Sequence, residues 1–66
     1  MKSKQELQDF YRYQVKRIIA KLVAENLTQA NFSRKAALTI LSKTDSDVFW
    51  SRLFLENEQA IFSRLS

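Results

Sequence analysis

Apolar side chains recur every three or four residues through the first part of the chain, which is the spacing of one face of an α-helix. The positions are Leu7, Phe10, Tyr11, Val15, Ile18, Ile19, Leu22 and Val23. Ser3 and Glu6 match a capping box, which satisfies backbone N–H groups at a helix start. Asn26 suits the end of the helix, because asparagine tolerates the left-handed backbone conformation found there. The pattern predicts a helix over about 4–25.

A second helical stripe follows Thr28, which is a good N-cap residue. Its apolar members are Phe32, Ala36, Ala37, Ile40 and Leu41. Leu27 and Phe32 have the spacing of a hydrophobic staple across that cap. We therefore predict a second helix over about 29–43.

A polar cluster over residues 43–47 separates the second helix from a third. It supplies acidic charge for a first turn and three candidate N-caps, Thr44, Asp45 and Ser46. The third helix is predicted over about 46–64, with an apolar face broad enough to pack against two other helices. That face consists of Phe49, Trp50, Leu53, Phe54, Ala60, Ile61 and Leu65. Trp50 is expected to anchor the core, because its helical neighbours are also apolar.

The three elements predict an all-α fold, a compact three-helix bundle that forms a single domain over residues 1–66. Strands are not expected, because no stretch alternates apolar with polar residues for long and the chain has no Gly or Pro to turn a hairpin. Without Cys or His there is no disulfide or zinc site, and a domain of this size buries only about 60% of its unfolded surface. Self-association is the expected remedy for a thinly stable monomer.

A second apolar row lies on the predicted third helix, away from its core face. Val48, Leu55 and Phe62 are spaced seven residues apart and are bordered by polar side chains. Isolated apolar side chains are common on surfaces, so two of the three can simply wrap around a wide core. Alternatively, the row is a helix-to-helix seam for a homodimer or for a partner protein. We expect dimerisation through this helix.

Positive charge is concentrated in the first two predicted helices. Residues 1–43 hold nine Lys and Arg against three acids, a net of +6, whereas residues 44–66 hold two against four, a net of −2. Clustered cations with an interleaved aromatic ring suit a phosphate backbone, since each cation releases a condensed counterion and tyrosine can stack or hydrogen-bond. The candidate nucleic-acid-binding residues are Arg12, Tyr13, Lys16, Arg17, Lys21, Arg34 and Lys35.

Two other interpretations of these cations stay open. Lys and Arg are good helix formers that keep a helix soluble, and Asp9 and Glu25 partly neutralise them. An acidic protein or a membrane surface would attract the same side chains.

The stretch over residues 27–35 is similar to the way the first helix of a helix-turn-helix unit often begins. The similarity fails at the next helix, because a recognition helix presents polar side chains to base edges. Here Asp47, Phe49 and Trp50 would point acid and bulk at DNA. Reading of the major groove by the third helix is therefore rejected, and the first helix is expected to bear any nucleic-acid contact.

Catalysis is not expected from this composition. With no histidine, only a buried carboxylate or lysine could serve as a general acid or base near neutral pH. Glu56 and Glu58 are two residues apart on a helix, so they face different directions and form neither a dyad nor a metal site. The serines lack an imidazole to activate them. We expect a non-enzyme with no cofactor, no metal site and no small-molecule substrate.

The chain is expected to be cytoplasmic, complete from its own start codon and without a membrane partner. No apolar run approaches a membrane span, and the N-terminal segment does not read as a signal peptide.

Together these features predict a small basic helical regulator, for example of transcription, of the kind common in phages, plasmids and bacteria. It would bind nucleic acid through the first two helices and self-associate through the third. The alternative is a protein-binding modulator, such as an inhibitor, antirepressor or adaptor, that docks on a partner through Val48, Leu55 and Phe62.

Overall fold

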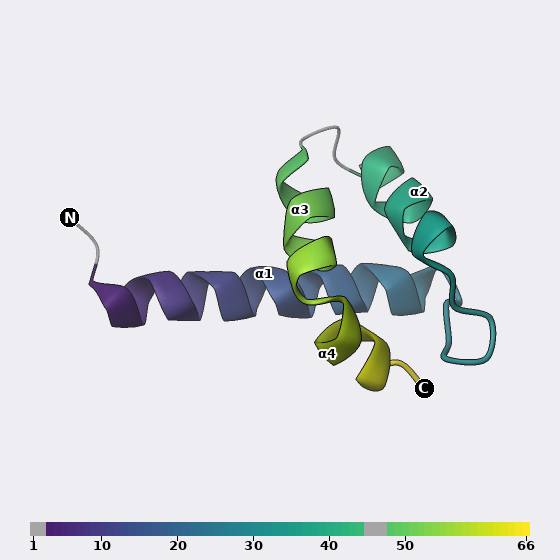
Figure 1. Cartoon of the computed structure of the whole chain (residues 1–66), viewed down its shortest axis with the longest axis horizontal. Helices are drawn as coiled ribbons and strands as arrows, with labels where there is room; N and C mark the ends of the chain where they lie inside the picture. Colours follow the sequence, from purple (N-terminus) through teal and green to yellow (C-terminus); the bar gives the residue numbers. More distant parts are fainter. Residues whose placement is uncertain (1–2, 45–47) are drawn as a thin grey trace.

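Four helices make up most of the two ranges that the computed structural model describes, residues 3–44 and 48–66. They are α1 (Lys4–Ala24), α2 (Arg34–Thr44), α3 (Val48–Glu56) and α4 (Glu58–Ser63). α3 crosses α1 near its middle and α2 lies over the C-terminal part of α1, whereas the N-terminal end of α1 projects past both (Figure 1). Neither described range contains a strand, so the predicted all-α class is confirmed.

The two ends of α1 are built as the sequence predicts. At the start, the Ser3 hydroxyl accepts a hydrogen bond from the N–H of Glu6 at 3.2 Å. At the end, Asn26 adopts a left-handed conformation with φ of 65°. The N–H of Leu27 donates to the carbonyl of Leu22 at 3.0 Å. The N–H of Asn26 donates to the carbonyl of Val23 at 2.9 Å. This pair of bonds is a Schellman motif, which stops the helix and turns the chain back toward the core.

The second helix begins later than predicted, at Arg34 and not near residue 29. The N–H and the hydroxyl of Thr28 both donate to Oδ1 of Asn31, at 2.7 and 3.2 Å. The amide of Asn31 in turn donates to the carbonyl of Asn26 at 3.1 Å. Thr28 is therefore part of a closed turn, because the Asn31 side chain bonds the backbone that a helix would need. The N-cap of α2 is Ser33, whose hydroxyl accepts a hydrogen bond from the N–H of Ala36 at 3.0 Å.

The prediction of one unbroken third helix over 46–64 is wrong, because the segment splits into α3 and α4 at Asn57. The side-chain amide of Asn57 donates to the carbonyl of Leu53 at 2.9 Å, and the backbone of Asn57 adopts φ −123° and ψ 22°. The Asn57 backbone N–H donates to the same carbonyl at 3.2 Å and also to that of Phe54 at 3.1 Å, so the last turn of α3 tightens there and α4 starts in a new direction. Of the caps predicted before this helix, Asp45 and Ser46 lie outside the described residues, and Thr44 is the last residue of α2.

The core forms where α2, α3 and α4 meet the C-terminal two thirds of α1. Its buried members are Ile18, Leu22, Leu27, Ala37, Leu41, Trp50, Leu53, Phe54, Ile61 and Leu65. Trp50 is buried as predicted, and its Nε1 donates to Oε1 of the buried Gln14 at 3.1 Å. That bond satisfies the only polar side chain that lies buried among the described residues, and it joins α3 to α1.

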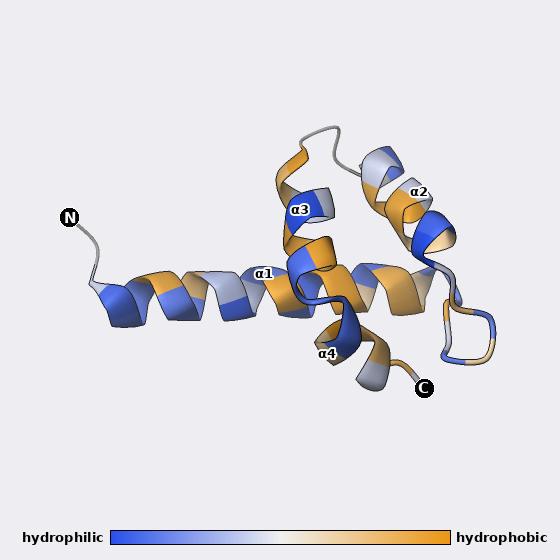
Figure 2. Cartoon of the chain, viewed as in Figure 1, coloured by the Kyte–Doolittle hydropathy of each residue, from blue (hydrophilic) through white to orange (hydrophobic). Residues whose placement is uncertain are grey.

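The first part of the predicted α1 stripe is not buried. Leu7, Phe10 and Tyr11 remain exposed, because α2, α3 and α4 are too short to cover the whole of α1. Apolar positions are visible on this projecting part as well as where α1 meets the other helices (Figure 2). The projection gives the chain extents of 40 × 24 × 18 Å and a radius of gyration of 12.0 Å. A more spherical domain of this length would have a radius of gyration of about 11 Å.

α4 is tied to the loop before α2 and to α2 itself. The N–H of Gln29 donates to the carbonyl of Ser66 at 3.0 Å, and its side-chain amide donates to the carbonyl of Phe62 at 3.2 Å. Nε of Arg34 donates to Oε1 of Glu58 at 2.8 Å. These links hold α4 across the bundle, where it forms one wall of a groove against α1.

Candidate nucleic-acid interface

The predicted basic residues of α1 are held on two flanks of the helix. Arg12 and Lys16 lie one turn apart, beside the groove against α4, and both are exposed. Arg17 lies on the other flank, beside α3. Lys21 is half-buried and pairs with Glu25 at 3.6 Å, so its charge is partly neutralised. Of the four α1 cations predicted to bind nucleic acid, Arg12, Lys16 and Arg17 therefore have no acidic partner among the described residues.

Arg17 is positioned by two aromatic rings. Its guanidinium carbon lies 5.2 Å from the centroid of the Trp50 ring and 5.9 Å from that of Tyr13. Both are cation–π distances, so the side chain is held along the α1–α3 seam. Tyr13 is 59% exposed, but one partner for its ring is already Arg17. Tyr13 is therefore less available for stacking than the sequence alone indicates.

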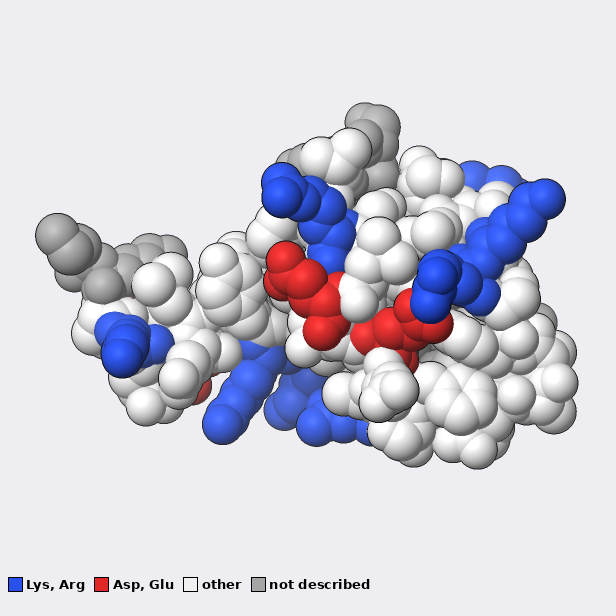
Figure 3. Space-filling view, in the orientation of Figure 1, with Lys and Arg blue, Asp and Glu red and all other residues white. Residues whose placement is uncertain are grey.

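The two cations of α2 are not continuous with those of α1. Arg34 is bound to Glu58, whereas Lys35 is exposed. In Figure 3 the cations below α1 and those over α2 form separate groups, with acidic and uncharged side chains between them. The seven predicted residues thus do not form one patch on the face that is shown.

A groove of about 620 Å³ lies between α1 and α4, and we call it the α1/α4 groove. It is lined by Gln8, Tyr11, Arg12, Val15, Lys16, Asn57, Ala60 and Arg64. Three of these eight side chains are cationic and none is acidic. The salt bridges found within residues 3–44 and 48–66 are Lys21–Glu25 and Arg34–Glu58, so the three groove cations have no acidic partner there. The groove is therefore concave and basic, with no acidic residue in its lining among the described residues.

Of the eight lining residues, the sequence predicted only Arg12 and Lys16 as site residues, and two of those it missed carry charge or an aromatic ring. Arg64 is 48 residues beyond Lys16 in the chain, and only the turn at Asn57 brings α4 against α1. Tyr11 was assigned to the core stripe, but it is 45% exposed and lines the groove. The pattern of charges on α1 alone contains no signal for either.

The predicted interface residues are found in two different settings. Val48 and Leu55 on α3 are 65% and 48% exposed. Phe62 is half-buried, and its ring packs 5.1 Å from that of Phe32. Because Asn57 separates α3 from α4, the three do not form one straight row. Phe62 contributes to packing within the chain, while Val48 and Leu55 remain on the surface.

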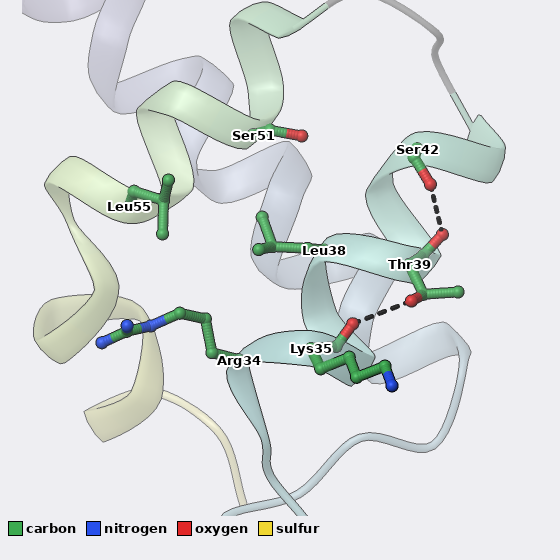
Figure 4. A pocket seen from close by; sticks show the side chains of 7 residues that line it. All are labelled: Arg34, Lys35, Leu38, Thr39, Ser42, Ser51 and Leu55. Atoms are coloured by element: carbon green, nitrogen blue, oxygen red, sulfur yellow. Dashed lines mark hydrogen bonds between the residues drawn. The ribbon is translucent and has the colours of Figure 1, made fainter.

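Leu55 also lines a second groove, of about 660 Å³, between α2 and α3 (Figure 4). Leu38 lies opposite it on α2, and Arg34 and Lys35 border the groove. The hydroxyls of Thr39 and Ser42 donate to carbonyls of their own helix, at 2.8 and 2.9 Å. With these donors engaged, the groove presents mainly apolar surface.

Some other kinds of site find no support in the described ranges. No group of three or more acidic, His or Cys side chains there is placed to hold a metal ion. None of the helices described is both long and apolar enough to cross a membrane. Comparison with protein-family models, with curated proteins and with solved structures gave no match.

Proposed function

We propose that this protein is a small basic regulator that binds nucleic acid through α1 and associates with a second copy through the apolar side chains that α3 leaves exposed. The observation that carries the proposal is that Arg12, Lys16 and Arg17 of α1, and Arg64 at the end of α4, have no acidic partner among the described residues. Cations without acidic partners release counterions when they meet phosphates, which drives binding. Arg34 and Lys35 are secondary, because the first is engaged by Glu58.

The test is a titration of labelled duplex DNA and of structured RNA at several salt concentrations. With four cations in contact, affinity for duplex falls on the order of a hundredfold between about 50 and about 200 mM salt. The double variant Arg12→Gln, Lys16→Gln removes two of the contacts. The slope of log affinity against log salt concentration should therefore become less steep by about 2. Absence of binding to either nucleic acid even at low salt would refute the proposal.

A matched control for charge is the double variant Lys35→Gln, Lys43→Gln, which removes two exposed cations from α2. Its effect on affinity is expected to be smaller than that of the α1 pair. An equal loss from both pairs would mean that net charge alone attracts nucleic acid and that α1 is not the contact surface.

Self-association is proposed to use Val48 and Leu55, because these are large apolar side chains that the chain itself does not cover. Size-exclusion chromatography with light scattering is expected to show a dimer for the wild type and a monomer for the variant Val48→Ser, Leu55→Ser. Both positions are exposed, so the helical circular dichroism signal should persist. The control is Leu7→Ser, which changes an apolar side chain of α1 that is 43% exposed and should leave the dimer intact.

A dimer lost in Leu7→Ser but retained in the α3 variant would move the seam to the projecting end of α1. A monomeric wild type would refute self-association and favour the second candidate, a modulator that docks on another protein. The observation that favours this candidate is the apolar groove of Leu38 and Leu55, whose size and composition suit the side chains of a partner helix.

A further inference from the structure

The α1/α4 groove places positive charge on two opposed walls. Arg12 and Lys16 stand one turn apart on α1, and Arg64 stands on the α4 side. Between them the lining is apolar at Val15 and Ala60. An anion that enters the groove is therefore approached by cations from both sides, while an uncharged planar group can lie on the apolar surface.

The Tyr11 ring completes this arrangement. It lines the groove beside the cations and is 45% exposed. Its ring contact with Phe10 is T-shaped, with the ring centroids 5.7 Å apart and 65° between the ring planes, so the two rings are not stacked face to face. Tyr13, by contrast, lies next to the Arg17 guanidinium. Tyr11 is therefore the aromatic side chain placed for stacking next to the groove cations.

A nucleic-acid duplex cannot use all of these features together. Its bases are stacked inside the helix, and its phosphates meet a protein on a convex surface. A single strand can turn one base out onto an aromatic ring while the phosphates on either side reach cations. A concave site with an aromatic wall and three cations fits the second arrangement.

We infer that the α1/α4 groove binds single-stranded nucleic acid, with a base stacked on Tyr11 and phosphates held by Arg12, Lys16 and Arg64. This inference rests on the proposed nucleic-acid binding and specifies the form of nucleic acid that is bound. Because every base has a stacking face and charge supplies much of the affinity, little sequence preference is expected.

The test compares a labelled oligodeoxythymidylate of about 12 nucleotides, within the range of single-strand sites, with a hairpin duplex that has the same number of phosphates. The single strand is expected to bind more tightly. Tyr11→Ala should weaken single-strand binding roughly tenfold to a hundredfold and leave duplex binding within about twofold, whereas Tyr11→Phe should retain the affinity of the wild type. Arg64→Gln should flatten the logarithmic salt dependence for the single strand by about 0.7. Lys43→Gln, which removes a cation outside the groove, is the matched control.

The outcomes separate this inference from the proposed function. Duplex binding that equals or exceeds single-strand binding, with no effect of Tyr11→Ala or Arg64→Gln, would overturn the groove assignment and leave nucleic-acid binding by α1 intact. Failure of both probes at low salt would end the proposed function itself. A third outcome would also overturn the inference. If polyglutamate of equal charge displaces the oligonucleotide, and Tyr11→Ala and Tyr11→Phe lose the same amount of oligonucleotide affinity, the site recognises acidic chains of any kind. Urea unfolding of each variant checks that the fold is unchanged.

Discussion

Replacing Phe54 by alanine is expected to unfold most of the protein at 25 °C. The side chain is fully buried at the centre of the core, and its ring lies 6.2 Å from that of Phe32 in the loop before α2. A buried Phe→Ala change costs about 3–5 kcal/mol through lost transfer free energy and the cavity left behind. A single core in a chain of this size supplies roughly the same amount in total. Far-UV circular dichroism with and without urea measures the loss.

Two further variants locate the effect. Phe54→Leu keeps an apolar side chain in the site and should cost about 1–2 kcal/mol, with a measurable urea transition. Val48→Ala changes a side chain that is 65% exposed and should alter the free energy of unfolding by no more than about 0.5 kcal/mol. A urea midpoint for Phe54→Ala equal to that of the wild type would show that the core is not arranged around this ring.

The ends of α1 were predictable from sequence because each depends on a local interaction. Ser3 and Glu6 are three residues apart, and the left-handed turn at Asn26 needs only the backbone of the preceding helix. The core residues of α3 were likewise predictable, since Trp50, Leu53 and Phe54 share one helical face. In each case residues that are close in sequence determine the structure.

The other asparagines explain where the prediction of helix boundaries went wrong. Asn31 closes a turn with Thr28, and the Asn57 side chain bonds the Leu53 carbonyl that its own backbone N–H also uses, so both side chains make local bonds at a helix boundary. An asparagine in an exposed helix position gives no sign in the sequence that it will do this. At Asn57 the outcome depends on contacts far away in the sequence. The turn lets α4 and the residues after it bond the loop before α2, through Gln29.

The candidate site was the least predictable part. Its α1 cations could be found from charge patterning, but Arg64 joins them only because α4 turns back after Asn57. The exposure of Tyr11 follows from a mismatch of lengths, since α1 has 21 residues and the helices that cover it have 11, 9 and 6. A helical stripe predicts which face is apolar, and it does not predict how much of that face finds a partner.

The buried contact between Trp50 and Gln14 gives the second large effect. Trp50→Ala should destabilise the protein by about 3–5 kcal/mol, enough to unfold it, and it also removes one of the rings that hold Arg17. Milder changes separate packing from hydrogen bonding. Trp50→Phe leaves Oε1 of Gln14 buried without its donor, and Gln14→Leu leaves Nε1 of Trp50 without its acceptor, so each should cost about 1–3 kcal/mol.

The decisive measurement is the sign of Gln14→Leu in two backgrounds. In the wild type the change removes a partner and destabilises, whereas in the Trp50→Phe protein it removes an unsatisfied polar group from the core and should stabilise. Leucine and glutamine have similar helix propensities, so α1 itself contributes little to the difference. Urea denaturation of the four proteins gives the coupling free energy. If Gln14→Leu changes stability equally in both backgrounds, the hydrogen bond between α1 and α3 contributes nothing, and the placement of Arg17 beside it must depend on ring packing alone.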